Sequence, residues 1–164
     1  MPDTPDPQDH AVSRLELKVP PDLVAIAVAL AMWLVSAVTP SVVVPLGYRL
    51  AAALVLTAAG IALIVAARVA FARAGTTFSP VTPTRAARLV TTGVYSRSRN
   101  PMYLGTLLVL LGLAAMLANP FSLVAPAGFV AYIDRFQIVP EERVLEARFG
   151  PTFAAYASNV RRWA

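Results

Sequence analysis

Three clusters of polar residues stand at the ends of apolar stretches, where membrane proteins most often carry their functional groups. One cluster holds Asp134 and Arg135, followed by the neighbours Glu141 and Glu142. A carboxylate here could take a proton from a reacting group or attract a cationic ligand. Because neighbours on a helix point to different sides, only one of the two glutamates is expected to face a given pocket. Pro140 before them also fits a helix start with the carboxylates at its positive end, so a structural role is equally open.

The second cluster, residues 93–95 and 99–105, leads into an apolar run. Asn100 is a favourable helix N-cap, and Pro101 suits a first helical turn because its missing N–H would be unpaired there anyway. A capped helix start explains this cluster as well as a binding site does. The third cluster, residues 75–80, is rich in turn formers and its signal is weak.

The residue inventory excludes several kinds of site. The chain has no cysteine, which rules out a disulfide, a thiolate metal site and a thiol nucleophile. Its single histidine, His10, lies in a polar segment near the N-terminus, so the body of the chain has no imidazole to act as base or metal ligand. We therefore expect no metal. The net charge of +5 does not indicate nucleic acid as a partner, because the arginines stand beside apolar stretches rather than among stacking aromatics.

The apolar stretches that must position these clusters are long enough to cross a membrane. With 57% hydrophobic and 14% charged residues, the chain lies outside the usual range of soluble proteins. Residues 39–45 leave room only for a tight turn, and Asn119–Pro120 breaks the second half, so the helices should form two antiparallel hairpins. We predict an all-α, polytopic membrane protein with four transmembrane helices at about residues 22–39, 46–71, 101–118 and 121–139.

The remaining segments differ in composition. Residues 1–21 are rich in proline and aspartate and are predicted to be a flexible tail, and residues 22–164 a single domain. A polar connector at residues 72–100 carries five arginines, and the C-terminal segment at residues 140–164 carries four. Because Lys and Arg collect on the cytoplasmic side, we expect the connector and both termini in the cytoplasm. In a three-span alternative, the last apolar run lies in the interface and the C-terminal arginines fall outside.

Several single residues have structural interpretations. Arg49 lies near the start of the second apolar run, where a long side chain can reach the headgroups. Trp163 is expected to anchor at the membrane interface, and Arg162 beside it to contact headgroups. Gly105 and Gly112 are small residues that allow close helix packing.

In this order and spacing, the clusters resemble the isoprenylcysteine carboxyl methyltransferase family and its bacterial relatives in the wider phospholipid methyltransferase group. The resemblance covers about residues 68–163 and runs through residues 89–95, 99–105, 119–120, 141–142, 149–150, 156 and 160–163. It implies a bacterial inner-membrane enzyme that holds S-adenosylmethionine at the cytoplasmic membrane face, between the connector and the last two helices. By the same resemblance, the cofactor pocket consists of Leu89, Val90, Tyr95, Asn100, Pro101, Met102, Tyr103 and Glu141.

Two positions depart from that family. Its usual histidine before the proline is Asn100 here, which forms hydrogen bonds but does not titrate near neutrality. Its substrate-binding arginine, four residues before the glutamate, is Gln137 here. Bacterial relatives often carry an Asp–Arg pair such as Asp134–Arg135, which the resemblance implies takes over substrate contact. The expected catalytic residues are therefore Glu141, Asp134 and Arg135, with Arg135 and Gln137 binding substrate.

The expected function is methyl transfer from S-adenosylmethionine to a lipid-like or small amphiphilic acceptor that enters from the bilayer. One alternative is N-methylation of a phospholipid or another lipid. An alternative of another class is a noncatalytic membrane scaffold or carrier. A transporter would favour ionisable residues deep within its spans, and the centres of the four apolar runs carry none.

Overall fold

The regular elements are all helical in the computed structural model, which describes residues 16–75 and 88–164. The predicted all-α class is confirmed. The cluster at residues 75–80, apart from Gly75, lies outside the described residues, as do His10 and most of the predicted tail. Two elements are 3₁₀ turns (η2 and η3) and one is a π-helical turn (η4). In chain order the elements are α1 (Pro21–Val38), α2 (Leu46–Arg73), η2 (Gly93–Ser96), α3 (Pro101–Leu117), η3 (Pro120–Leu123), α4 (Val124–Ile133), η4 (Asp134–Ile138), α5 (Val139–Phe149) and α6 (Pro151–Asn159).

Two of the described helices, α1 and α2, are long and apolar enough to cross a membrane. Pro21 begins α1 because a first helical position needs no N–H donor. The outer faces of both helices expose large apolar side chains, among them Ile26, Trp33 and Leu54. A soluble protein would bury such a surface, whereas lipid tails would cover it. α3 is also apolar and shorter, at 17 residues.

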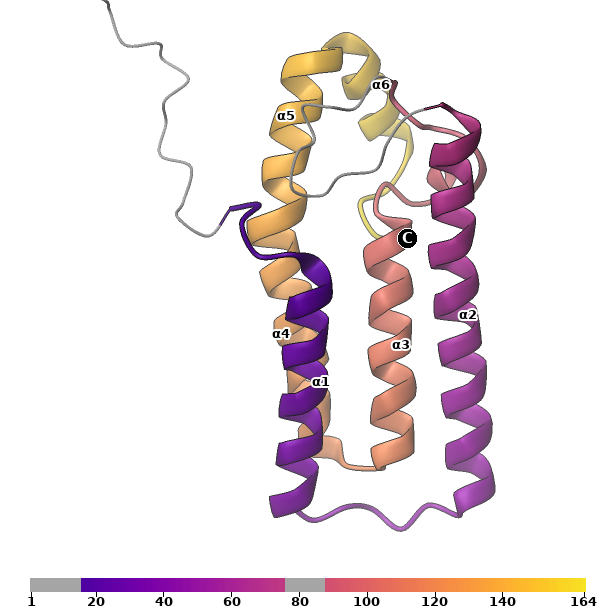
Figure 1. The fold of residues 1–164 in the computed structure, drawn as a ribbon, viewed down its shortest axis with the longest axis vertical. Coiled ribbons are helices and arrows are strands. Elements are labelled where there is room, and N and C mark those ends of the chain that lie inside the picture. Colours follow the sequence, from indigo (N-terminus) through magenta and orange to yellow (C-terminus); the bar gives the residue numbers. More distant parts are fainter. Residues whose placement is uncertain (1–15, 76–87) are drawn as a thin grey trace, which may run out of the picture.

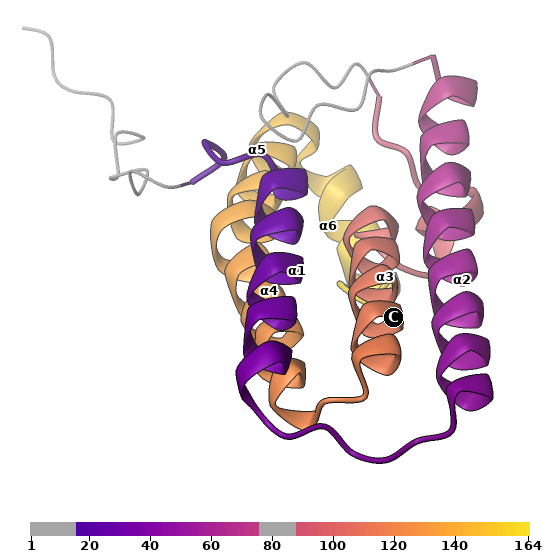
Figure 2. The same cartoon turned by 60° about the horizontal axis from the view of Figure 1, so that its bottom comes forward.

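α3 lies between α2 on one side and α1 with α4 on the other (Figures 1 and 2). The contact between α2 and α3 depends on glycine. A methyl group at Gly60 would stand 2.5 Å from the Gly105 carbonyl oxygen, and one at Gly112 would stand 2.5 Å from the Thr57 hydroxyl. Without side chains at these positions the two backbones approach closely, as small residues allow between membrane helices. The prediction for Gly105 and Gly112 is confirmed.

The connection predicted for the first hairpin is wrong. α1 and α2 run in opposite directions, but residues 39–45 are extended and pass across the end of α3, which separates the two helices (Figure 2). The Val42 N–H donates to the Ala118 carbonyl at 2.8 Å, and the Asn119 side-chain amide donates to Thr39 and Pro40. Extended residues reach about 3.3 Å each, so even this short segment can cross a neighbouring helix.

α3 and α4 form the second predicted hairpin around Asn119–Pro120. Ala118 ends α3 in the left-handed conformation, with φ of 49°, and the Asn119 side chain accepts a hydrogen bond from the Ser122 N–H at 3.1 Å. Arg49 binds the same end of α3, because its Nε donates to the Met116 carbonyl at 2.8 Å. Rather than reaching the headgroups as predicted, Arg49 satisfies a carbonyl that a helix C-terminus leaves unpaired.

α4, η4 and α5 form one continuous helix, so Pro140 lies within a helix and the predicted helix start is wrong. Pro140 has no N–H to donate to the Phe136 carbonyl four residues earlier. The Leu17 N–H donates to that carbonyl instead, at 3.1 Å, and the helix widens into a π turn that ends at Ile138, two residues before the proline. Gly150 ends α5 with φ of 48°, and Pro151 begins α6.

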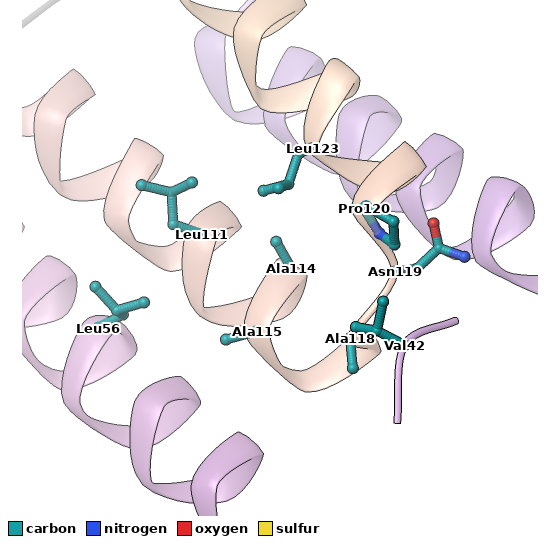
Figure 3. Close-up of a pocket in the computed structure, with 9 residues that line it drawn as sticks. All are labelled: Val42, Leu56, Leu111, Ala114, Ala115, Ala118, Asn119, Pro120 and Leu123. Atoms are coloured by element: carbon teal, nitrogen blue, oxygen red, sulfur yellow. The ribbon is translucent and has the colours of Figure 1, made fainter. Parts of the chain in front are cut away.

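An apolar pocket of about 390 Å³ opens between α2, α3 and η3, near the C-terminal end of α3 (Figure 3). No ionisable side chain lines it, so it offers no group for acid–base chemistry. Its lining residues are Val42, Leu56, Leu111, Ala114, Ala115, Ala118, Asn119, Pro120 and Leu123.

Candidate functional site

The candidate site lies at the other end of the bundle, where the start of α3, η2, α5 and the C-terminal segment meet (Figure 1). Its central contact joins α3 to α5, because the Tyr103 hydroxyl donates to Oε1 of Glu141 at 2.8 Å. Burial raises the pKa of Glu141 to about 8; the hydrogen bond from Tyr103 opposes this rise, and the charge of Glu142 adds to it. Glu141 is therefore a carboxyl group that titrates close to neutral pH, suited to meeting a cation or exchanging a proton.

Apolar residues of the connector and of the start of α3 pack together nearby. Val90, Tyr95 and Met102 pack into one buried cluster against the end of α2. The Tyr95 ring meets Phe71 edge-on, with ring centroids 5.2 Å apart. The Tyr95 carbonyl accepts a hydrogen bond from the Tyr156 hydroxyl at 2.7 Å. η2 therefore ties the connector to both α2 and α6.

The C-terminal segment runs beside the start of α3. The Arg99 N–H donates to the Arg161 carbonyl at 2.9 Å, and Nδ2 of Asn100 donates to the Arg162 carbonyl at 2.9 Å. Asn100 occupies the N-cap position of α3 as predicted. Its side chain does not cap the helix, because it binds the Arg162 carbonyl instead. Trp163 packs against the apolar core, which differs from the predicted interface anchor.

A network of ion pairs surrounds the second glutamate. Glu142 contacts Arg162 at 2.6 Å and Arg99 at 2.9 Å, and Arg162 also contacts Asp134 at 3.2 Å. Arg162 is therefore held by carboxylates of the protein, which differs from its predicted contact with headgroups. Glu141 and Glu142 have different partners, as expected of neighbours on a helix. The Nε of Arg99 is buried and has no partner among the described residues, which leaves this donor open to a ligand.

The eight predicted cofactor residues lie on the segments that meet here. Asp134 reaches the same network through Arg162. The two predicted substrate residues do not join it: Arg135 pairs with Glu16 at 2.9 Å, and Nε2 of Gln137 donates to a backbone carbonyl of the segment before α1 at 2.7 Å. Within residues 16–75 and 88–164, no three His, Cys, Asp or Glu side chains gather where they could hold a metal ion.

Two residues of this region, Arg99 and Glu16, are missing from the sequence-based predictions. Arg99 has a readable signal, because it stands directly before Asn100 and Pro101 in the second polar cluster. Glu16 has none, since its partner Arg135 follows 119 residues later. Only the folded chain brings such distant residues together.

Comparison with known proteins identifies the family of the chain. The family described as phospholipid methyltransferase matches residues 48–152, a range that contains all eight predicted cofactor residues. The chain belongs to this family. The predicted resemblance is thereby confirmed, and the family makes the chain a membrane methyltransferase.

Three relatives of this methyltransferase are informative. It is 40% identical over 62 residues to an uncharacterised protein of Haemophilus influenzae, over 38% of this chain and 98% of that protein. It is 40% identical over 73 residues to protein-S-isoprenylcysteine O-methyltransferase B of Arabidopsis thaliana, over 44% of this chain and 37% of that protein. It is 43% identical over 75 residues to protein-S-isoprenylcysteine O-methyltransferase A of the same plant, covering 44% and 36%. The methyltransferase thus spans little more than a third of either plant protein, and no solved structure matches it.

Proposed function

We propose that the chain uses S-adenosylmethionine to methylate an amphiphilic acceptor at the cytoplasmic membrane face, in the manner of isoprenylcysteine carboxyl methyltransferases. The observation that carries this proposal is the hydrogen bond between Tyr103 and Glu141, which fixes a partly buried carboxyl group where the connector, α3 and α5 meet. Membership of the phospholipid methyltransferase family supports the reaction class.

The described residues fit such a cofactor chemically. S-adenosylmethionine carries a sulfonium cation, an amino group and a carboxylate, and its adenine base has apolar aromatic faces. Glu141 offers a carboxylate for a cation, and the buried Nε of Arg99 offers an unpartnered donor for an anion. Val90 and Met102 supply apolar side chains in the buried cluster against the end of α2. Leu89, Val90, Tyr95, Asn100, Pro101, Met102, Tyr103 and Glu141 are the residues proposed to hold the cofactor.

The same proposal includes the topology. α1, α2, α3 and residues 121–139 would cross the membrane, with the connector, residues 140–164 and both termini on the cytoplasmic side of a bacterial inner membrane. Exposed apolar surface on α1 and α2 supports the spans. The arginines of residues 72–100 and 140–164 support the orientation, because cytoplasmic segments carry an excess of Lys and Arg. The candidate site then lies at the cytoplasmic boundary, within reach of an acceptor that moves in the bilayer.

The bound cofactor would supply an electrophilic methyl group, which an acceptor lone pair attacks in line as the carbon–sulfur bond breaks. The protein has to align the two reactants and keep bulk water out. A carboxylate or thiolate acceptor needs no base, whereas an amine or thiol must lose a proton. Glu141 is the best-placed base, since its pKa is raised to about 8 and its only described partner is the Tyr103 hydroxyl. Asp134 is paired with Arg162 and is less available.

N-methylation of a lipid is the second candidate, and one observation favours it. Gln137 stands where prenylcysteine methyltransferases place an arginine, and its amide nitrogen already donates to the Val19 carbonyl. A carboxylate acceptor would find no cation at this position. Labelled methyl groups distinguish the two reactions, because a carboxyl ester is lost in mild base and an N-methyl product is stable.

Calorimetric titration of S-adenosylmethionine into the detergent-purified protein tests the proposal. We expect saturable binding that is lost in Tyr103→Ala and Glu141→Ala and kept in Glu146→Gln, a change at an exposed glutamate on the same helix as Glu141. Circular dichroism confirms that each variant is folded. No binding by the unaltered protein, in detergent or in nanodiscs, would refute the proposal and favour a noncatalytic scaffold or carrier.

A further inference from the structure

Residues 16–20, which we call the strap, lie against the π turn η4 just before α1 begins. Three consecutive residues of this turn bind to the strap. Arg135 pairs with Glu16 at 2.9 Å, the Phe136 carbonyl accepts from the Leu17 N–H at 3.1 Å, and Gln137 donates to the strap backbone at 2.7 Å. Figure 1 shows the segment before α1 beside the continuous helix that contains α4 and α5. The contacts follow the same order in both segments, so the strap docks in one register.

Glu16 is the most deeply buried ionisable group of the strap. Its side chain is 2% exposed, and it also lies 3.4 Å from Arg143. A carboxylate is withdrawn from water only where cations replace its hydration. Arg135 belongs to η4 and Arg143 to α5, so one carboxylate joins the strap to both sides of Pro140.

The backbone on either side of this contact is held away from its ordinary conformation. Leu17 has φ of 57°, which is uncommon for a residue other than glycine and persists only where surrounding contacts hold it. A π turn is a wider and rarer helical conformation, frequent at functional sites. The Leu17 N–H and the Phe136 carbonyl satisfy one another, so the two unusual segments stabilise each other.

The π turn carries groups that face two directions. Asp134 joins the network of Arg162 and Glu142, next to Glu141. Gln137 is 1% exposed, and its Oε1 has no hydrogen-bond partner among the described residues. A buried acceptor atom without a donor is costly, so a ligand that donates to it would bind with an advantage. Any shift of the turn moves Asp134 and Gln137 together.

We propose that Glu16 is a positioning residue for methyl transfer: through Arg135 and Arg143 it holds the strap on the π turn and so fixes Gln137 and Asp134 for the acceptor. This inference rests on the proposed function. By this inference Arg135 holds the acceptor site in place through Glu16, and Gln137 contacts the acceptor itself. Glu16 is paired with Arg135 and Arg143, whereas Tyr103 and Glu141, on the cofactor side, are bonded to each other. A change at Glu16 should therefore leave the cofactor side intact.

Hydrogen–deuterium exchange tests the support directly and needs no activity. In Glu16→Gln we expect faster exchange at residues 17–19 and 134–139 than in the unaltered protein. Exchange where α2 packs on α3 should be the same in both proteins. Glu16→Asp, which keeps the charge, should lie between the two. Glu146→Gln, the exposed change on α5, should exchange like the unaltered protein. Equal exchange in Glu16→Gln and the unaltered protein would overturn the inference.

Kinetics test the positioning. The acceptors are N-acetyl-S-farnesylcysteine and vesicles of phosphatidylethanolamine, each with labelled S-adenosylmethionine. With the acceptor that is methylated, Glu16→Gln should raise KM about tenfold while the Kd for S-adenosylmethionine stays within twofold. In Glu16→Asp, which keeps the charge, KM should lie close to that of the unaltered protein. A lower KM would instead mean that Glu16 competes with the acceptor, and a parallel loss of cofactor affinity would mean general damage; both contradict the inference. Failure of the proposed function would appear separately, as absence of cofactor binding by the unaltered protein.

Discussion

The titration of Glu141 should control cofactor binding. In the free protein its pKa is raised to about 8, first because the group is buried. A sulfonium cation beside it favours the ionised carboxylate, so binding should be coupled to loss of a proton. Affinity for S-adenosylmethionine should therefore rise with pH until Glu141 is ionised in the free protein, and level off above that point.

The size of the effect follows from the pKa. At about pH 6, two units below the pKa, only about 1% of Glu141 is ionised, and ionising the rest costs about 2.7 kcal/mol at 1.36 kcal/mol per unit. The Kd should accordingly be about a hundredfold weaker at pH 6 than at about pH 9, if only the ionised form binds. The stability of the ligand-free protein should change in the opposite direction. A raised pKa means that the neutral form prefers the folded state, so stability is lost as pH rises from about 4.5 to about 8.

Isothermal titration calorimetry between pH 6 and pH 9, in two buffers of different ionisation enthalpy, measures both the Kd and the protons released. The amino group of S-adenosylmethionine titrates in the same range, so the comparison that matters is with Glu141→Gln. This variant keeps a hydrogen-bond acceptor for Tyr103 but cannot ionise. It should bind at every pH about as weakly as the unaltered protein does at about pH 6, and retain only the pH dependence that belongs to the cofactor.

A pH profile shared by the unaltered protein and Glu141→Gln would refute this reasoning. So would an affinity that falls between pH 6 and pH 8 in the unaltered protein alone, since that would place a neutral carboxyl group in the complex. A steep profile in the unaltered protein that disappears in Glu141→Gln would identify Glu141 as the group that meets the cation.

Three further changes test the packing around the site. Tyr103→Phe removes the donor to Glu141, which should move the binding profile to higher pH and lower the free energy of unfolding by about 1 kcal/mol. Gly105→Ala puts a methyl group 2.7 Å from a backbone carbonyl oxygen of α2 and should lower the unfolding temperature, whereas Gly47→Ala, with open space around it, should leave it equal or slightly higher. Arg162→Ala should expose residues 160–164 to carboxypeptidase and cost no more than about 1 kcal/mol, because its side chain is partly exposed to water; equal digestion would mean that its two ion pairs do not hold the segment.

The helices themselves could be predicted from the sequence, because apolar runs bounded by proline leave few alternatives. Pro21 and Pro101 stand at the starts of α1 and α3, as a missing N–H favours. The neighbours of each helix could not be predicted in this way. α1 and α2 are apolar around most of their circumference, so no stripe shows which face meets protein and which meets lipid. The short 39–45 segment fits a turn and a crossing equally well.

The candidate site was predictable where its signals are local. Tyr103 and Glu141 were expected at one pocket and form a hydrogen bond, and the separate partners of Glu141 and Glu142 follow from helix geometry. The functions of Asn100 and Arg162 in holding the C-terminal segment were not predictable, because each depends on a partner far along the chain. Pro140 is instructive for another reason. It marks a π turn within a helix, and that conformation depends on the strap as well as on the proline itself.

The pairing of residues 98–100 with residues 161–162 has a consequence for biosynthesis. Membrane helices enter the bilayer one after another as the ribosome makes them, and α1 to α4 need nothing from residues 160–163 to do so. The candidate site does need them, because they supply the carbonyls that Arg99 and Asn100 bind and the guanidinium that Asp134 and Glu142 share. Insertion into the membrane and completion of the site would therefore be separate steps of biosynthesis. A variant truncated before residue 160 should be membrane-integrated and inactive.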